Sequence, residues 1–145
     1  MRRNGLLILL VLLLAFIWGN SCMPVRVSSQ ESGWVLNLLR PLLEPFVGKG
    51  HVTHHLVRKL AHFTEFTALG AVLGLLLLSG RRRLVTVLSV LLLGLLVAFL
   101  DESIQMLSDR GDQIIDVWLD FSGVILGAVL AGAVLCLRRR RNKHP

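Results

Sequence analysis

The sequence predicts an all-α, polytopic membrane protein with four transmembrane helices and a surface amphipathic helix in the first outer loop. The chain has 145 residues and is 54% hydrophobic, which is too apolar for a soluble domain of this size. It holds four apolar stretches, each close to the roughly 20 residues that a helix needs to cross a bilayer. These stretches lack the period-2 alternation of barrel strands. Helices are therefore expected, because they satisfy their backbone amides internally in lipid.

The charged residues predict the orientation of the chain in the membrane. Ten of the 16 Lys and Arg residues lie in three patches without any acidic residue, at 2–3, 81–83 and 138–143. All nine acidic residues lie in or beside the two alternate gaps. Positively charged loops stay on the cytoplasmic side, so we expect a multi-pass protein of the cell membrane with both termini in the cytoplasm. The net charge of +7 does not indicate nucleic-acid binding, because the basic clusters adjoin apolar helices, where they contact membrane lipids.

These patterns divide a single membrane domain, residues 1–145, into seven segments. The expected segments are a first transmembrane helix at about 5–22, an outer loop at 23–58, a second helix at about 59–79, a third at about 84–101, an outer loop at 102–116, a fourth helix at about 117–137 and a basic cytoplasmic tail at 138–145. A second interpretation of the N-terminus stays open, namely a cleavable signal peptide with a lipoprotein site at Cys22. Gly19 stands where such a site has a branched apolar residue, so we favour an uncleaved helix.

The first outer loop carries the pattern of an amphipathic helix. Residues 27–33 are polar and predict a turn. Apolar residues then recur at helical spacing, at Trp34, Val35, Leu38, Leu39, Leu42 and Leu43. This pattern predicts a helix lying on the outer membrane surface, with Ser32 as its N-cap. Pro41 should kink it and Pro45 should end it. Residues 48–53 are expected to link it to the second transmembrane helix.

Ionisable residues at the outer ends of the apolar stretches predict a polar pocket. At 100° per residue, Arg58, His62 and Glu65 fall within an arc of about 60° on the second helix, with Lys59 at its margin. A charged group at that depth costs several kcal/mol unless it is paired, hydrated or neutralised. The candidate pocket residues are Arg58, Lys59, His62, Glu65, Asp101, Glu102, Gln105, Arg110, Asp116 and Asp120. Below Asp120, small residues share one face of the fourth helix and predict a packing seam; they are Gly123, Gly127 and Ala131.

The order of these residues resembles the VanZ-like family, named after an accessory teicoplanin-resistance protein. The resemblance covers nearly the whole chain and rests on three blocks. They are Asn20-Ser21-x-Met23-Pro24 with Ser28-Ser29-Gln30-x-Ser32-Gly33; Arg58-Lys59-x-Ala61-His62-Phe63-x-Glu65-Phe66-x-x-Leu69-Gly70; and Asp101-Glu102-x-x-Gln105, Arg110 and Asp116-Val117-x-x-Asp120-x-x-Gly123-x-x-x-Gly127. The family more often has Tyr at Phe66 and often Asn at Asp120, so the charge of Asp120 is not essential to what the family shares.

The resemblance implies a four-helix membrane protein, linked in its namesake to reduced teicoplanin susceptibility, but no settled reaction. The pocket is expected to contact a lipid-linked envelope precursor or a glycopeptide, with phosphate on the basic side chains. Three alternatives stay open: an acid/base enzyme acting on a lipid headgroup, a transporter, and a scaffold whose polar cluster is structural. The transporter is disfavoured because the inner halves of the helices lack ionisable residues.

Catalytic residues cannot be assigned from the sequence. His62 with a carboxylate is a plausible base and orienting group, but the nearby hydroxyls, Thr64 and Ser103, lie in no nucleophile motif. His51, His54 and His55 cluster without a decisive ligand spacing. We therefore expect no metal and no cofactor, and the sequence leaves the oligomeric state open.

Overall fold

The described residues form five α-helices in a computed structural model. The structure describes residues 3–23, 25–48, 51–78, 83–107 and 114–141, including their side chains except at 25–32, 34, 47 and 83. The helices are α1 (Arg3–Ser21), α2 (Val25–Val47), α3 (His54–Leu77), α4 (Arg83–Leu107) and α5 (Ile114–Arg141). All except α2 are long and apolar enough to cross a membrane. The predicted all-α class with four such helices is confirmed.

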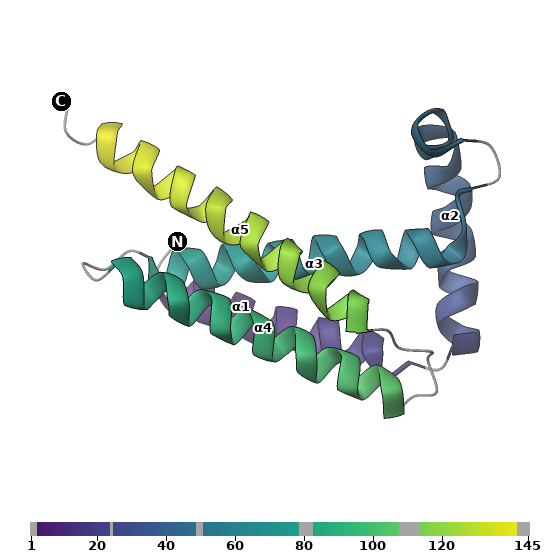
Figure 1. Ribbon diagram of the computed structural model, residues 1–145, viewed down its shortest axis with the longest axis horizontal. Coiled ribbons are helices and arrows are strands. Elements are labelled where there is room, and N and C mark those ends of the chain that lie inside the picture. The colour runs from purple at the N-terminus through teal and green to yellow at the C-terminus, as the bar shows by residue number, and fades with distance from the viewer. Residues whose placement is uncertain (1–2, 24, 49–50, 79–82, 108–113, 142–145) are drawn as a thin grey trace.

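The four apolar helices run along the long axis of the molecule, and α2 lies across one end of them (Figure 1). The start of α1 and the end of α5 both lie at the opposite end, as an even number of crossings requires. Helix α5 crosses α3 and then diverges from α4 towards its C-terminal end. The molecule therefore has one end covered by α2 and another end that carries both termini.

Two helix boundaries differ from the expected ones at the α2 end. Helix α4 continues to Leu107 and α5 already begins at Ile114, so most of the expected outer loop at 102–116 is helical. Glu102 and Gln105 are consequently helical residues, and both are buried. A polar helix end is stable inside a protein when neighbouring helices supply partners. Hydropathy alone places the end of a helix where the apolar residues stop, which is too early here.

The expectations for α2 were wrong in three respects. The helix begins at Val25, so residues 27–33 form no turn and Ser32 is not an N-cap. Pro45 lies inside the helix and does not end it. Pro41 also lies inside it, and the last part of α2 is seen end-on in Figure 1, which agrees with the bend expected of a proline inside a helix. The helix instead ends before Gly48, whose φ of 92° is left-handed. The Gly48 amide donates to the Glu44 carbonyl at 2.9 Å, a common way to close a helix.

Helix α2 has one face on the protein and another facing away from it. Leu36 is buried in a small cluster with Val52 and Val57, and Val57 belongs to the first turn of α3. Thr53 caps α3 by accepting a hydrogen bond from the Leu56 amide at 3.2 Å. The outward apolar residues of α2 are Leu38, Leu42 and Phe46, which are 56%, 64% and 87% exposed. An exposed apolar face on a helix lying across a bundle end suits the membrane interface.

The main core joins the four long helices, and its closest contact is between α3 and α5. Ile17, Phe66, Val90 and Val124 supply one buried core residue from each. Glycines let the two backbones touch. A Cβ atom on Gly123 would lie 2.7 Å from the Phe63 carbonyl oxygen, and one on Gly127 would lie 2.6 Å from the Ala71 amide nitrogen.

The α3 side of this contact also uses small residues. A Cβ on Gly70 would lie 2.7 Å from the Cα of Val124, and one on Gly74 would lie 2.7 Å from the Cβ of Ala131. The structure thus places Gly123, Gly127 and Ala131 at the α3–α5 contact. Each helix places two glycines one turn apart at this contact, Gly70 and Gly74 on α3 and Gly123 and Gly127 on α5. The contact therefore fixes the position of α5 along the axis of α3.

We predict that Gly127→Ala lowers the stability of the protein by about 1–3 kcal/mol, because the added methyl group meets backbone atoms that cannot move aside. Gly132→Ala is the matched control on the same helix, since a Cβ there meets nothing within 4 Å; it should be neutral or stabilise by up to about 1 kcal/mol. The measurement is thermal unfolding of both variants in detergent. Equal melting temperatures would contradict the close contact of α3 with α5.

Candidate functional site

Polar residues from four helices meet inside the end of the bundle that α2 covers. Each helix contributes where its apolar stretch begins or ends: α1 at its last residues, α3 and α5 in their first turns, and α4 in its last turns. The buried polar and charged residues are Ser21, Asp101, Glu102, Gln105 and Asp120. Buried polar groups in an apolar protein need partners, and the contacts of Asp101 show how these are arranged.

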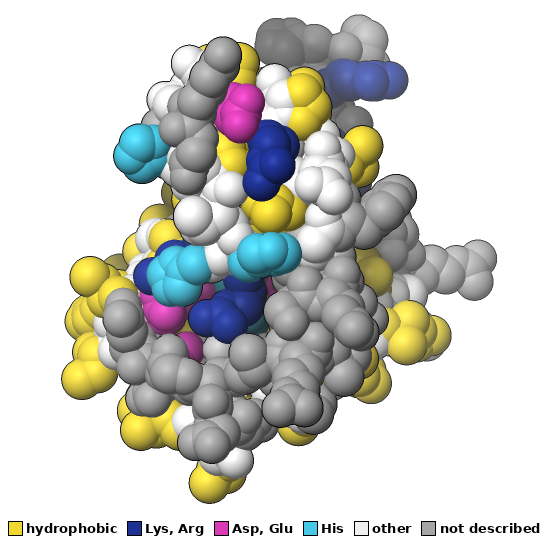
Figure 2. Space-filling model, turned by 90° about the vertical axis from the view of Figure 1, so that its right-hand side faces the viewer, with side chains coloured by type: hydrophobic (Ala, Val, Ile, Leu, Met, Phe, Trp, Pro, Cys, Tyr) yellow, Lys and Arg dark blue, Asp and Glu magenta, His cyan; other side chains and the backbone are white. Residues whose placement is uncertain are grey.

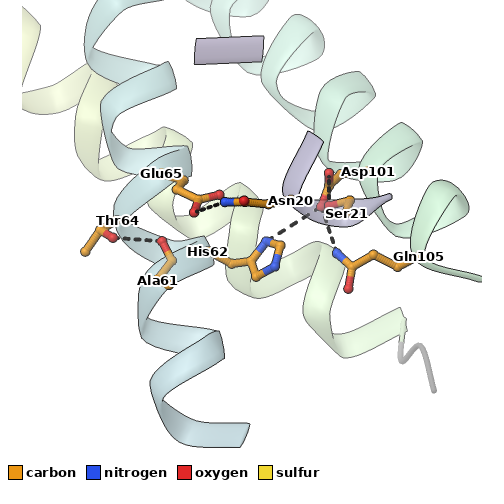
Figure 3. A network of polar contacts seen from close by, with 8 residues as sticks. All are labelled: Asn20, Ser21, Ala61, His62, Thr64, Glu65, Asp101 and Gln105. Atoms are coloured by element: carbon orange, nitrogen blue, oxygen red, sulfur yellow. Dashed lines mark hydrogen bonds and ion pairs between the residues drawn. The ribbon is translucent and has the colours of Figure 1, made fainter. Parts of the chain in front are cut away.

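Asp101 of α4 is the centre of the cluster (Figure 3). Its side chain has no exposed surface. The Ser21 hydroxyl donates to its Oδ1 at 2.6 Å, and the Gln105 amide donates to its Oδ2 at 2.8 Å. The Nδ1 atom of His62 lies 3.6 Å from the same Oδ2. Asp101 therefore connects α4 with the end of α1 and with α3.

A second contact between α1 and α3 lies beside the first. The Asn20 amide donates to Oε1 of Glu65 at 3.2 Å. The other carboxyl oxygen, Oε2, is buried without a hydrogen-bond partner among the described residues. Neighbouring residues of α1 thus bind two different acids, Glu65 on α3 and Asp101 on α4, and hold the end of α1 against both helices.

A small polar pocket opens next to this cluster. Its lining residues are Arg58, Lys59, His62, Glu102, Gln105, Asp116, Leu119 and Asp120, and its volume is about 10 Å³, which is on the order of one water molecule. Lys59 and Asp116 form an ion pair across it, with 2.6 Å between Nζ and Oδ1. Figure 2 shows basic, acidic and histidine side chains gathered on the face of the molecule at the α2 end.

Asp120 of α5 is a buried acid that lines the pocket and lacks a full set of hydrogen-bond partners. It is 2% exposed, and its Oδ1 has no hydrogen-bond partner in the part of the chain that the structure describes. One ligand-type atom from each of His62, Asp101 and Asp120 lies within 4.8 Å of the other two. The glycine contact places Asp120 here, because Gly123 directly follows it on the face that meets α3.

Nine of the ten candidate residues come together. Those that line the pocket are Arg58, Lys59, His62, Glu102, Gln105, Asp116 and Asp120. Asp101 and Glu65 lie behind it, bonded to α1, and Arg110 lies outside the described residues. The candidate set omitted Asn20 and Ser21. The sequence did offer a signal for them, because they form a polar pair at the end of an otherwise apolar helix and belong to the first family block.

The two hydroxyls considered as nucleophiles do not line the pocket. Ser103 donates to the Phe99 carbonyl and Thr64 to the Ala61 carbonyl, each at 2.7 Å within its own helix. The pocket can instead supply cations, carboxylates, an amide and an imidazole beside a carboxylate. This set can bind a phosphate group or an amine, and it can move a proton between His62 and bound water.

We predict that Ser21→Ala lowers stability by about 1–3 kcal/mol, because it leaves Oδ1 of the buried Asp101 carboxyl without its donor. Ser103→Ala is the matched control, because it removes a hydroxyl bonded only to its own helix; it should stay within about 0.5 kcal/mol of the wild type. Thermal unfolding in detergent measures both. If the two variants melt alike, Ser21 does not hold Asp101 in place.

The comparisons with known proteins identify a family. No curated protein and no solved structure matches the chain. A family model described as VanZ/LLP1 matches residues 6–136, a range that contains most of α1 and α5, all of α3 and α4, and all the pocket residues. The chain is therefore a multi-pass membrane protein and belongs to the VanZ/LLP1 family.

Proposed function

We propose that this protein binds the phosphate-bearing headgroup of a lipid-linked cell-envelope precursor at the mouth of its polar pocket, at the outer leaflet of the cell membrane. The observation that carries the proposal is the pocket itself: two cations from α3 stand beside buried carboxylates, an amide and an imidazole, at one end of helices that are otherwise apolar. A ligand held there has its polar group at the membrane surface and its chains in the bilayer.

The two basic side chains supply the phosphate contacts in this proposal. Arg58 and Lys59 both line the pocket. Lys59 forms an ion pair with Asp116, but an ammonium group has three N–H donors, so two remain for a ligand. A guanidinium can bind two phosphate oxygens at once. The carboxylates behind them suit a second, cationic part of the ligand or a bound metal ion.

The orientation follows from charge. The pocket lies at the α2 end, and the basic patches at 81–83 and 138–143 adjoin the opposite ends of the apolar helices. Basic residues remain cytoplasmic, so the pocket faces outward and both termini lie inside. The outer side of the membrane is where lipid-linked wall precursors and glycopeptides meet. The exposed apolar residues of α2 support the same placement, because they suit the outer membrane surface.

A role in lowering teicoplanin susceptibility is the specific form of this proposal that the family name suggests. Competition between the pocket and a glycopeptide for the same lipid-linked precursor would supply the physical link. A susceptible host that expresses the wild-type chain should therefore be less sensitive to teicoplanin than the same host with the Arg58→Ala/Lys59→Ala chain. Equal sensitivity of the two hosts would contradict the teicoplanin role.

An acid/base enzyme on the same ligand is the second candidate, favoured by the geometry around His62. Its Nδ1 lies 3.6 Å from Oδ2 of Asp101, and Asp101 is held by Ser21 and Gln105. A fixed carboxylate can orient an imidazole and support it as a general base. Since neither Ser103 nor Thr64 lines the pocket, the reaction in this case is attack by a water molecule on the headgroup phosphate.

We predict that purified protein in lipid nanodiscs binds a polyprenyl diphosphate, and that Arg58→Ala/Lys59→Ala weakens this binding tenfold or more, because charge-assisted hydrogen bonds contribute about 1.5–3 kcal/mol each. Arg138→Ala/Arg139→Ala removes the same charge at the other end of the bundle and should leave the affinity within about twofold of wild type. Thermophoresis measures the affinity. Equal weakening by both double variants would overturn the proposal.

The same samples separate binding from catalysis. Mass spectrometry of the recovered lipid shows unchanged diphosphate if the protein only binds it. Conversion to the monophosphate that His62→Gln abolishes, while binding is retained, is the result that the enzyme candidate requires.

The two cysteines test the orientation. Both are exposed; Cys22 follows α1 at the pocket end, and Cys136 lies near the basic end of α5. We predict that a membrane-impermeant maleimide labels Cys22 in intact cells and labels Cys136 only after permeabilisation. Single-cysteine variants, Cys22→Ser and Cys136→Ser, assign the label by mass. Labelling of Cys136 alone in intact cells would reverse the proposed orientation.

A further inference from the structure

We infer that His62, Asp101 and Asp120 form a binding site for one divalent transition-metal ion, with Zn²⁺ as the best-fitting ion. The sequence predicts no metal site, because its clustered histidines lack a decisive ligand spacing. The fold places them on α3, α4 and α5, with one ligand atom of each within 4.8 Å of the others. An imidazole with two carboxylates is a donor set that suits Zn²⁺ and Mn²⁺.

The burial of Asp120 is the independent observation that points to a ligand. Its side chain is 2% exposed and its Oδ1 has no hydrogen-bond partner among the residues described. A buried carboxylate without compensation is costly, and proteins resolve that cost by pairing it or by coordinating a metal. The Asp120 carboxyl belongs to the same three-residue group as His62 and Asp101, so a cation between them would supply the missing partner.

The local charges leave room for such a cation. Lys59 is engaged by Asp116 at 2.6 Å, so its charge is balanced there. Asp101, Glu102 and Asp120 are buried in the same cluster, and Arg58 is the basic residue lining the pocket beside Lys59. Carboxylates thus outnumber the basic side chains in the described pocket, and a divalent cation would offset the excess.

The groups around the three ligands resemble the supporting contacts of metal sites. Ligating carboxylates are usually held by further hydrogen bonds, which orient them. Asp101 accepts one from Ser21 and one from Gln105, which fix the orientation of its carboxylate. His62 and Asp120 also line the pocket of about 10 Å³, where a water molecule can complete the coordination.

The geometry requires a small closure. Ligand atoms about 2.0–2.2 Å from Zn²⁺ in a tetrahedral site lie roughly 3.3–3.6 Å apart. The distances between the three ligand atoms, which are at most 4.8 Å, therefore have to shorten by at most roughly 1.5 Å. Rotation of the side chains can provide this change. A metal bound there would fasten α3, α4 and α5 together. It would also present an open coordination position to the pocket, where the phosphate of the proposed ligand or an attacking water could bind.

The experiment uses the full chain in detergent, carried on an affinity tag without histidine, stripped with chelator and titrated with Zn²⁺ alone. We expect isothermal titration calorimetry and elemental analysis to give one tightly bound Zn²⁺ per chain. Asp120→Asn and His62→Ala should each weaken binding tenfold or more, and Zn²⁺ should raise the melting temperature of the wild type but not of these variants. Co²⁺ in place of Zn²⁺ should give a visible absorption band that both variants lose.

A matched control excludes surface binding and global effects. His54→Ala/His55→Ala removes the two exposed histidines at the start of α3, outside the three ligands, and should keep the wild-type Zn²⁺ affinity. If His62→Ala fails to fold, Asp120→Asn, which keeps the shape of its side chain, decides the question. No Zn²⁺ or Mn²⁺ binding, or unchanged binding in Asp120→Asn and His62→Ala, would overturn the inference. Since no lipid is present, this result is independent of the proposed phosphate binding.

Discussion

The close backbone contact between α3 and α5 is the constraint on which the site depends. Gly123 and Gly127 of α5 meet backbone atoms of α3 with no room for a Cβ, so the helices cannot slide or rotate freely past each other. Asp120 lies one turn before Gly123 on that face. It is therefore held at the level of His62, and Asp116, one turn earlier, reaches Lys59. A packing interaction in the apolar half of the bundle thus sets the geometry of a polar pocket at its end.

The other half of the site depends on hydrogen bonds instead of small residues. Asn20 and Ser21, the last residues of α1, bind Glu65 and Asp101 on two different helices. In an apolar environment there is little hydrophobic force between helices, and polar contacts of this kind contribute to their association. The same contacts fix the Asp101 carboxylate towards His62. Structural stability and a functional arrangement therefore rest on the same atoms, and removing one partner affects both.

This overlap explains why a scaffold and a binding site are difficult to separate from residue types alone. A cluster that only joined helices would have its polar atoms satisfied by each other. In the described residues, one oxygen each of Glu65 and Asp120 lacks such a partner, and the Lys59 ammonium keeps donors beyond Asp116. Unused hydrogen-bonding capacity near a pocket at one end of the bundle is the feature on which the proposed ligand site rests.

The sequence by itself determined the four apolar helices, the choice of acids and bases at one end, and the small residues of α5. These follow from composition and from spacing along one helix, because hydropathy and the 3.6-residue period are local properties. It did not determine that α2 continues past Pro45, or that Asn20 and Ser21 join the site. It predicted one pocket that holds His62, Asp101 and Asp120, but not that one ligand atom of each lies within 4.8 Å of the other two. Only the tertiary structure decided these, because each depends on contacts between helices, which the order of residues along any one of them does not encode.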